Sequence, residues 1–410
     1  MDKQINRNLL FLASCLALIS TSMSFAIRGD LMGVWGDVFS LTSEQVGWVT
    51  GTAFWGFTLA MVIGGPIVDI VGMKRIMGMA FVGHAAGIAL TIMASGFWTL
   101  FLGTLLIGIA NGFVEAACNP LVAGMYTDNK TKMLNRFHVW FPGGIALGGV
   151  LMYLMSGAGL SWQLKVATMA IPTILYGVIF FGQKFPQTER VASGLTMSDM
   201  FKACTRPLFL FMVGCMLLTA ATELGTNQWI TSLLENVGVA SILVLVFINV
   251  LMASGRMFAG PIVHRFSESG MLLFSAIFSG LGLYLMSITS GYAIFAAAGV
   301  FAIGITFFWP TMLGYVNTKM PETGALGLSI MGGAGMLSTS LILPMMGKVY
   351  DGQVQAAIES GVAEAQAGLV GGATTLSYMV VLPIILVAAF AYLHFVVGKN
   401  KTEVAEKAEA

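Results

Sequence analysis

The chain repeats one feature along almost its whole length: apolar runs long enough to cross a bilayer, separated by short polar segments. A helix needs about 20 apolar residues to span the hydrocarbon core, whereas a strand of a membrane barrel needs about ten residues of alternating polarity. Of the 410 residues, 57% are hydrophobic and 10% are charged, whereas soluble domains carry about 25% charged residues. These observations predict an all-α membrane protein.

The apolar runs and the breakers between them predict twelve transmembrane helices. The spans lie near residues 8–29, 45–66, 75–95, 97–124, 136–157, 164–182, 207–232, 239–262, 270–289, 291–316, 324–348 and 373–397. The first run, with its charged start, also fits a signal peptide. We expect an uncleaved span instead, because its removal would leave an odd number of helices.

The Lys and Arg residues fall unevenly on the two sides of these spans. With the N-terminus inside, all except Arg28, Lys165 and Lys348 lie in cytoplasmic segments. Because Lys and Arg collect on the cytoplasmic side of short loops, this pattern predicts that both termini are cytoplasmic. The predicted organisation is a six-helix bundle over 1–183, a cytoplasmic linker over 184–206, a second six-helix bundle over 207–398 and a cytoplasmic tail over 399–410.

Short matches at corresponding positions indicate that the two bundles are related. The segment GPIVD at 65–69 closes span two, and GPIVH at 260–264 closes span eight. Spans four and ten each contain a proline followed four residues later by a glycine, at Pro120 and Pro310. In transporters, duplicated halves of this kind place the substrate site between them, near the bilayer midplane.

Span four carries a carboxylate at bilayer depth. Asn111, Glu115 and Asn119 are spaced i, i+4 and i+8 and share one helix face, and Gly108 and Gly112 beside them permit close helix packing. A charged group there costs at least ~2.5 kcal/mol, so this face must meet protein or a wet cavity. A dry site favours the protonated acid, which can release its proton when the cavity opens to water. Glu115 is therefore our first candidate for proton coupling, and a permanently protonated structural acid is the alternative.

Span seven repeats this pattern in the second bundle, with Thr219, Glu223 and Asn227 at the same spacing. Carboxylates and amides suit a sugar, because sugar hydroxyls both donate and accept hydrogen bonds. Glu223 is the second candidate for proton coupling, or it binds sugar hydroxyls only. From the two spans we predict six substrate-binding residues: Asn111, Glu115, Asn119, Glu223, Asn227 and Gln228.

Three further polar or aromatic positions join the predicted substrate site. His138 and Trp140 open span five, and Trp309 lies in span ten. Histidine titrates near neutrality, and aromatic rings pack on the apolar faces of sugars. An interfacial position is the alternative for His138 and Trp140, and plain packing is the alternative for Trp309. Asp30, near the outer end of span one, is the third candidate for proton coupling; it could instead pair with Arg28 or lie at a solvated edge.

The segment GGPIVDIVGMKR at 64–75 resembles the loop signature between spans two and three of the major facilitator superfamily. The resemblance implies the major facilitator fold, in which two pseudo-symmetric six-helix bundles rock around the substrate. It also implies that Asp69 caps a helix end and pairs with basic groups across the half-interface, which latches one conformation. The predicted gating residues are Asp69, Lys74, Arg75 and Arg256.

A narrower resemblance rests on three segments. EAACNP at 115–120 and TELGTNQW at 222–229 resemble the Glu-containing motifs of spans four and seven in sugar:proton symporters of the fucose-permease type, and NRFHVWFPGGIALGG at 135–149 is also similar. The resemblance implies import of a sugar together with a proton. It further implies an essential acid in span one, which Asp30 matches approximately.

The sequence shows no other chemistry. It contains no phosphate-binding Gly-Lys-Ser/Thr loop, no His/Cys metal cluster and no basic nucleic-acid patch. We predict a transporter without enzymatic activity, cofactor, metal or nucleic-acid partner, working as a monomer in the bacterial inner membrane. The leading function is proton-coupled sugar import by alternating access. Sodium coupling, proton-driven export of drugs or metabolites, and a non-transporting receptor or scaffold are the alternatives.

Overall fold

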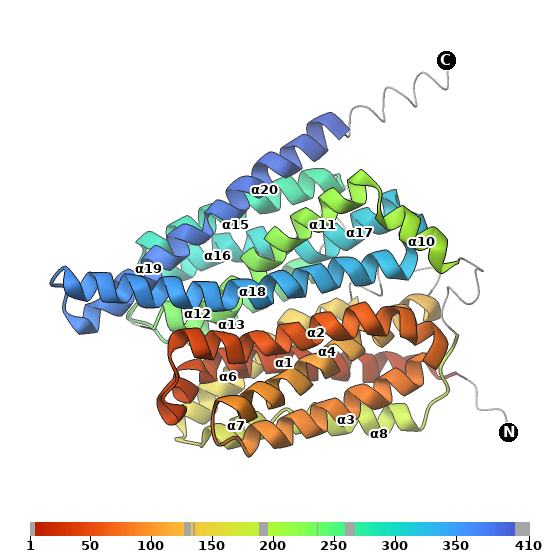
Figure 1. Cartoon of the computed structure of the whole chain (residues 1–410), viewed down its shortest axis with the longest axis horizontal. Coiled ribbons are helices and arrows are strands. Elements are labelled where there is room, and N and C mark those ends of the chain that lie inside the picture. The colour runs from red at the N-terminus through yellow and green to blue at the C-terminus, as the bar shows by residue number, and fades with distance from the viewer. Residues whose placement is uncertain are drawn as a thin grey trace.

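The computed structural model describes residues 5–126, 133, 136–187, 196–235, 237–258 and 267–397. These residues form helices joined by short turns, and no β-strand occurs among them. The helices stack as two bundles, one built from the N-terminal part of the chain and one from the C-terminal part (Figure 1).

The N-terminal half contains seven helical segments within the described ranges. They are α1 (Arg7–Phe39), α2 (Ser43–Val71), α3 (Met73–Ile92), α4 (Phe97–Met125), α6 (Trp140–Gly157), α7 (Trp162–Ala167) and α8 (Ala170–Phe181). Helices α7 and α8 follow each other as one candidate membrane span.

The C-terminal half is reached through the short linker helix α10 (Met197–Cys204). Its elements are α11 (Pro207–Ala220), the π-helical turn η2 (Ala221–Gly225), α12 (Thr226–Leu233), α13 (Ser241–Met257), α15 (Glu268–Ile288), η3 (Gly291–Ala293), α16 (Ile294–Ile305), α17 (Phe308–Lys319), η4 (Pro321–Thr323), α18 (Gly324–Glu359), α19 (Glu364–Met379), α20 (Val381–Tyr392) and η5 (Leu393–Val397). Several of these segments join end to end into single spans.

The predicted twelve-helix architecture is confirmed. Within the described ranges, 11 helical stretches are long and apolar enough to cross a membrane, and the shorter apolar α13 is one more. Several spans are longer than predicted, and two of them extend furthest beyond their predicted ends. Helix α1 continues past residue 29 to Phe39, and α18 continues past residue 348 to Glu359. The alanine-containing segment 351–369, predicted as a loop, is largely helical because alanine favours helix; it forms the hairpin of α18 and α19 that projects at one end in Figure 1.

The two halves meet along three helix pairs: α2 with α18, α1 with α12, and α6 with α13. Thr58 of α2 donates a hydrogen bond to the Gly333 carbonyl of α18 (3.3 Å), and Thr231 of α12 donates to the Gly29 carbonyl of α1 (2.8 Å). A Cβ atom on Gly47 would lie 2.9 Å from the Pro344 Cα. Backbone therefore approaches backbone across the interface, as expected where small residues mediate helix contact in a membrane.

Glycines also allow close packing inside each half. A Cβ on Gly108 would lie 1.9 Å from the Ala53 carbonyl oxygen, and one on Gly112 would lie 2.6 Å from the Phe57 carbonyl oxygen, both on α2. The predicted role of these two glycines in close packing is therefore confirmed. In the C-terminal half, Gly304 of α16 meets the α15 backbone in the same way.

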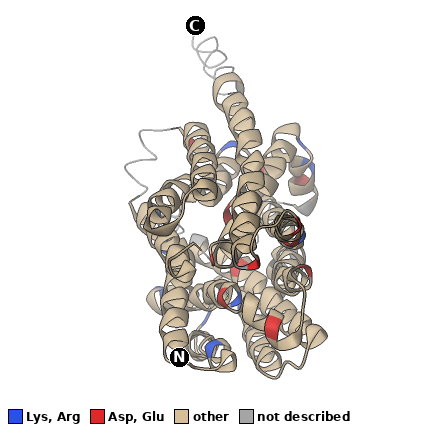
Figure 2. Cartoon of the chain, turned by 90° about the vertical axis from the view of Figure 1, so that its left-hand side faces the viewer, with Lys and Arg blue, Asp and Glu red and all other residues tan. Residues whose placement is uncertain are grey.

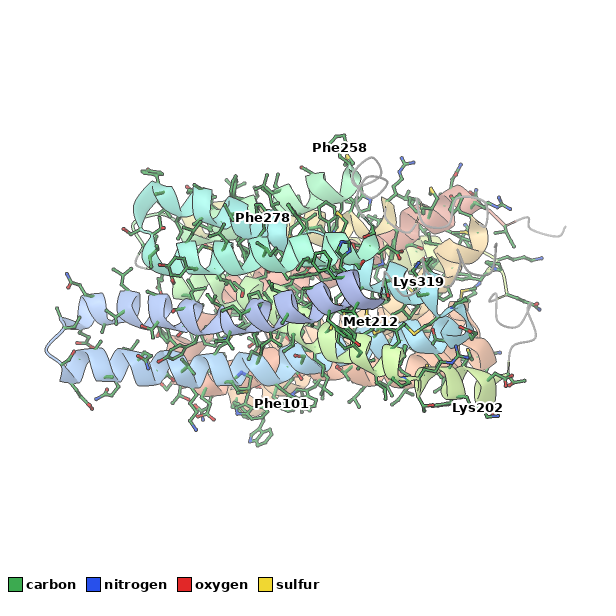
Figure 3. The ribbon with its side chains drawn as sticks, turned by 90° about the horizontal axis from the view of Figure 1, so that it is seen from above. Phe101, Lys202, Met212, Phe258, Phe278 and Lys319 are labelled. Carbon is green, nitrogen blue, oxygen red and sulfur yellow. The ribbon has the colours of Figure 1, made fainter. Side chains whose placement is uncertain are left out.

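The outer surface is apolar over most of its area. Viewed end-on, acidic and basic residues are few among the helices (Figure 2). Large apolar side chains are exposed, including Phe258, which is 66% exposed and stands at the margin of the molecule in Figure 3. Such a surface suits lipid and not water. The chain is therefore a multi-pass membrane protein.

Candidate functional site

A partly open cavity lies between the two halves, with about 310 Å³ of space not filled by protein atoms, open solvent included. The N-terminal half contributes Glu115, His138 and Phe141 to its lining, and the C-terminal half contributes Glu223, Leu224, Arg256, Trp309 and Met336. Both predicted intramembrane carboxylates therefore face one space from opposite halves.

On the N-terminal side, an amide connects an acid to an imidazole. Asn119 Nδ2 donates to Glu115 Oε2 at 2.7 Å, as their i, i+4 spacing on α4 allows. Because Nδ2 is the donor, Asn119 Oδ1 is free to accept from His138 Nε2 at 3.0 Å. His138 Nε2 lies 4.0 Å from Glu115 Oε2. The three groups form a continuous hydrogen-bonded chain from α4 to the helical turn before α6, which holds the acid and the imidazole at fixed positions beside the cavity.

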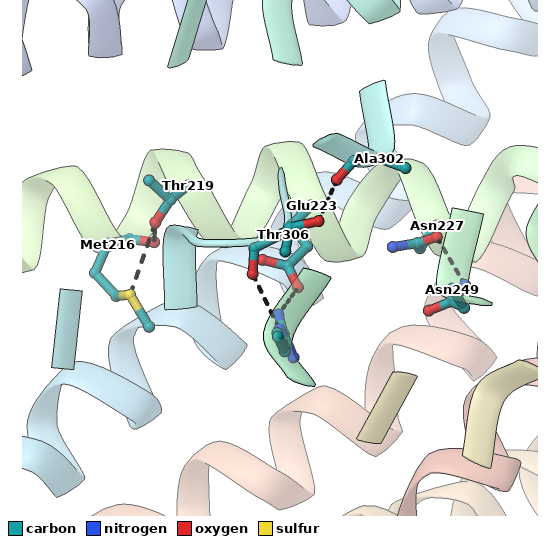
Figure 4. A network of polar contacts seen from close by, with 8 residues as sticks. Met216, Thr219, Glu223, Asn227, Asn249, Ala302 and Thr306 are labelled. Carbon is teal, nitrogen blue, oxygen red and sulfur yellow. Dashed lines mark hydrogen bonds and ion pairs between the residues drawn. The ribbon is translucent and has the colours of Figure 1, made fainter. Parts of the chain in front are cut away.

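On the C-terminal side, Glu223 forms an ion pair with Arg256 (Figure 4). The Oε1···Nη2 distance is 3.1 Å, and both side chains are almost completely buried. Glu223 Oε2 has no hydrogen-bond partner among the described residues. One carboxylate oxygen therefore binds the guanidinium, and the other is a buried acceptor without a donor among the described residues.

A proline provides the second contact of Arg256. Pro310 lacks an N–H, so the Thr306 carbonyl, four residues earlier, receives no helical hydrogen bond from it. Arg256 Nε donates to this oxygen at 3.0 Å. Helix α16 ends at Ile305 and α17 begins at Phe308, so span ten is interrupted close to its proline. Span four is not interrupted, because α4 continues through Pro120.

The predicted regular polar face of span seven is wrong between residues 221 and 225, which wind as a π-helical turn. Such turns insert an extra residue and occur frequently at functional sites. Thr219 donates to the Met216 carbonyl, Glu223 meets Arg256, and Asn227 Oδ1 accepts from Asn249 Nδ2 at 3.3 Å (Figure 4). The turn thus lets Glu223 and Asn227 contact different parts of α13.

Asn111 belongs to a second polar network and is not among the cavity-lining residues described above. His84 Nε2 donates to Asn111 Oδ1 at 2.8 Å, and His84 Nδ1 accepts from the Tyr176 hydroxyl at 2.9 Å. Asn111 Nδ2 donates to Ser24 Oγ at 3.2 Å, and this same oxygen accepts from Arg28 at 3.1 Å. The network joins α1, α3, α4 and α8, so Asn111 contributes to the interior of the N-terminal half.

Asp30 forms an ion pair with Lys165 and not with Arg28. Asp30 Oδ2 lies 2.8 Å from Lys165 Nζ, which also donates to Ser156 Oγ at 2.6 Å. Residues two positions apart on a helix point to different sides, which is why Arg28 and Asp30 do not meet. The alternative of an Arg28–Asp30 pair is therefore wrong, and so is a solvated loop edge, because both residues lie inside α1.

Comparison with known proteins identifies the family. A family model described as Major Facilitator Superfamily matches residues 10–344. The chain belongs to the major facilitator superfamily. Its fold and family are those of membrane transporters and not of enzymes.

The relatives include sugar transporters. A D-xylose transporter of Levilactobacillus brevis is 26% identical over 152 residues, which are 37% of this chain and 33% of that protein. The crystal structure of a D-xylose–proton symporter has a TM-score of 0.72 at 12% identity and covers 91% of this chain and 97% of that one. A variant of the Escherichia coli fucose:proton symporter FucP has a TM-score of 0.59 at 16% identity, covering 92% and 98%. The matched segment is about a third of the xylose transporter's length, and the two structures share the fold.

The superfamily loop signature at 64–75 covers the end of α2, Gly72 and the first residues of α3. Gly72 is the only residue between these helices, and its φ of 89° is one that glycine adopts without strain. Lys74 donates to the backbone carbonyls of Phe181 and Gln183, and Arg75 is exposed. The Lys74 contacts lie within the N-terminal half. The Asp69 side chain lies outside the described part of the structure, and the predicted gating residue Arg256 lies in the cavity.

Other predicted binding residues lie at or beyond the cavity edge. Gln228 Nε2 donates to the Phe25 carbonyl of the opposite half (3.4 Å). Trp309 lines the cavity and packs on α18 at Gly335. Trp140 is 43% exposed and is not among the cavity-lining residues. This exposure agrees with the alternative prediction of an interfacial position.

Sequence reasoning missed His84 and the partner of Glu223. His84 stands on an otherwise ordinary apolar helix, and its signal was the rarity of an intramembrane histidine. Arg256 was noticed as a basic residue at the end of a span, but its distance of 33 positions from Glu223 concealed the pairing.

Proposed function

We propose that this chain imports a sugar together with a proton by alternating access, as a monomer in the bacterial inner membrane with both termini cytoplasmic. One observation carries the proposal: an acid–amide–imidazole chain and an acid–guanidinium pair face the same cavity from opposite halves. The similarity to sugar:proton symporters supports the substrate class.

Glu115 carries the proton in this mechanism. Protonation neutralises Glu115, so the substrate site loses this negative charge. The two halves then close on the sugar. Opening inward admits water, which solvates the carboxylate and removes the proton. Asn119 orients Glu115 and His138, and His138, whose Nε2 lies 4.0 Å from the Glu115 carboxyl, assists proton exit through the water of the open side. Asn119, Glu223 and Trp309 supply hydrogen bonds and an apolar ring face to the sugar.

The test uses purified protein in liposomes with imposed proton or sodium gradients. Glu115→Gln keeps the shape of the side chain but cannot ionise. We expect the variant to exchange labelled sugar across the membrane while losing accumulation driven by a proton gradient. The matched control is Glu44→Gln, an exposed carboxylate in the first turn of α2, which should leave accumulation unchanged. Intact proton-driven accumulation in the Glu115 variant, or accumulation driven by sodium alone, would refute the proton-coupling role.

A further inference from the structure

Arg28 is a buried cation without an acidic partner among the described residues. The residue is 3% exposed, and its Nη1 donates a hydrogen bond to Ser24 Oγ at 3.1 Å. Within the described part of the chain, the buried Nε and Nη2 find no hydrogen-bond partner. The guanidinium carbon lies 4.8 Å from the Phe25 ring centre and 5.5 Å from that of Phe54.

Two other buried cations of this protein each have an acidic partner. Arg256 is paired with Glu223, and Lys165 is paired with Asp30. An unpaired buried charge costs several kcal/mol, and two aromatic faces return only about 1 to 4 kcal/mol together. An arginine with two unpartnered guanidinium nitrogens in a dry site is suited to a carboxylate or a phosphate, which it binds through paired hydrogen bonds.

Arg28 lies on α1, which packs against α12 of the opposite half. Phe25, one helical turn before it, packs edge-on against the cavity-lining Phe141 at 5.2 Å between ring centres. Gly29, the next residue, is covered by Gln228 and Thr231 of the opposite half. Gln228 Oε1 is itself buried, and no described residue donates to it. Unpaired donors and an unpaired acceptor are thus gathered at the half-interface on one side of the cavity.

The second polar network holds Arg28 in place. Ser24 Oγ accepts from both Arg28 and Asn111 and donates to the Thr21 carbonyl at 2.6 Å, which uses its full hydrogen-bonding capacity. Asn111 is in turn held by His84. A guanidinium anchored through one nitrogen is oriented before a ligand arrives, which lowers the entropy lost on binding.

The charges of the site link the binding of an anion at Arg28 to the protonation of Glu115. Glu223 and Arg256 cancel each other, which leaves Arg28 and Glu115, with His138 neutral, to set the net charge. With Glu115 ionised the empty site is neutral, and with Glu115 protonated it carries one positive charge. A bound monoanion then restores neutrality.

We propose that Arg28 binds the acidic group of a sugar acid, a carboxylate or a phosphate, which is carried as an anion together with the proton on Glu115. The proposal rests on the proposed function and specifies its substrate class. With a uronate bound, the empty and the loaded carrier have the same net charge, so co-transport of this monoanion with one proton is electroneutral.

The binding test measures thermal stabilisation of the purified protein by D-glucuronate, D-galacturonate and D-glucose 6-phosphate, with D-glucose as the neutral probe. We expect at least one acidic probe to bind at least tenfold more tightly than D-glucose. Comparison of the affinities for the uronates and for the phosphate ester identifies the acidic group. Arg28→Met should abolish this preference, and Arg28→Lys should retain part of it. Without ligand, Arg28→Met should unfold at the wild-type temperature or above, because it removes an unpaired buried charge. Should that variant fail to fold, Ser24→Ala, which removes the anchor, is expected to weaken acid binding at least severalfold.

The transport test uses the acidic probe that binds, in liposomes with an imposed pH gradient. Uptake of a uronate should be unchanged when valinomycin and potassium impose a membrane potential, whereas uptake of the phosphate ester, which carries about −1.5 to −2 charge at pH 7, should respond to the potential. The inference is overturned if no acidic probe binds, if D-glucose binds equally well, or if Arg28→Met keeps the preference for the acid. Proton-driven uptake of D-glucose alone would overturn it while leaving the proposed function intact. Arg28-dependent acid binding in a protein whose uptake ignores the proton gradient would refute the proposed coupling instead.

Discussion

Glu223 and Arg256 form an ion pair inside the C-terminal half, with side chains that are 3% and 4% exposed. The pair closes one wall of the cavity whose other wall carries Glu115. Removing one partner of a buried pair leaves an uncompensated charge and typically costs about 3 to 5 kcal/mol, whereas replacing both by apolar groups is often neutral.

The pair therefore predicts a non-additive stability effect. Glu223→Leu should lower the unfolding temperature strongly, because Arg256 loses its counter-charge. The double variant Glu223→Leu/Arg256→Met should recover most of that loss in a thermal unfolding assay while transport stays abolished. Additive destabilisation by the two changes would show that the pair is not energetically coupled.

Asn119 is predicted to connect His138 to Glu115. Asn119→Ala removes both hydrogen bonds of the bridge. A hydrogen bond to a charged group contributes about 1.5 to 3 kcal/mol, so proton-driven uptake should fall roughly 10- to 100-fold. The measurement is the initial rate under a pH gradient, with Asn8→Ala at an exposed position as control. An initial uptake rate equal to that of the control would argue against the proposed role of Asn119 in connecting His138 to Glu115.

Asp30 is predicted to be structural despite its candidacy for proton coupling. Its partner Lys165 belongs to α7 of the same half, and their pair is only slightly exposed. Asp30→Asn should lower the unfolding temperature, because Lys165 loses its counter-charge, and should leave the number of protons carried per substrate unchanged. A changed proton-to-substrate ratio, measured from pH and substrate fluxes in liposomes, would return Asp30 to the coupling machinery.

Gly108 is predicted to tolerate no side chain. A Cβ there would meet the Ala53 carbonyl oxygen at 1.9 Å, and neither backbone can yield without separating α4 from α2. Overpacking of this kind costs about 1 to 3 kcal/mol or more, so Gly108→Ala should reduce the folded fraction after heating. Gly78→Ala in α3, where no atom of the described residues lies within 4 Å of the new Cβ, should be neutral or stabilising. Equal behaviour of the two variants would contradict the close packing.

A pH-dependent contact is predicted at the exposed end of the C-terminal half. Hydrogen bonds from the Glu322 backbone N–H and from Arg206 hold the pKa of the Glu322 carboxyl below its ordinary value. Because the pKa is lowered in the folded state, the contribution to stability is present above the ordinary pKa and is lost as pH falls through the lowered value. The exposed pair is screened by solvent, so the effect is small. Relative to the intrinsic exchange rate at each pH, protection of the η4 amides against hydrogen exchange should fall at acid pH in the wild type and depend less on pH in Glu322→Gln.

The broad architecture was predictable because it depends on local properties. The length of each apolar run predicts one helix, and the breakers predict where helices end. After residue 29 in α1 and after residue 348 in α18, the helices continued through glycines such as Gly33 and Gly352, because an isolated glycine weakens a helix without ending it. The i, i+4 contact of Glu115 with Asn119 was likewise predictable, because helix geometry alone brings the two side chains together.

The partners of the buried charges were not predictable, because they come from distant segments. Arg256 reaches Glu223 across 33 positions, Lys165 reaches Asp30 across 135, and the π-helical turn that orients Glu223 has no clear sequence signature. The sequence by itself determined that this chain is a twelve-helix membrane protein with carboxylates at bilayer depth, since hydrophobicity and helical spacing are local. Only the tertiary structure decided which charges are paired and that Arg28 has no acidic partner among the described residues, because an ion pair depends on which helices pack together.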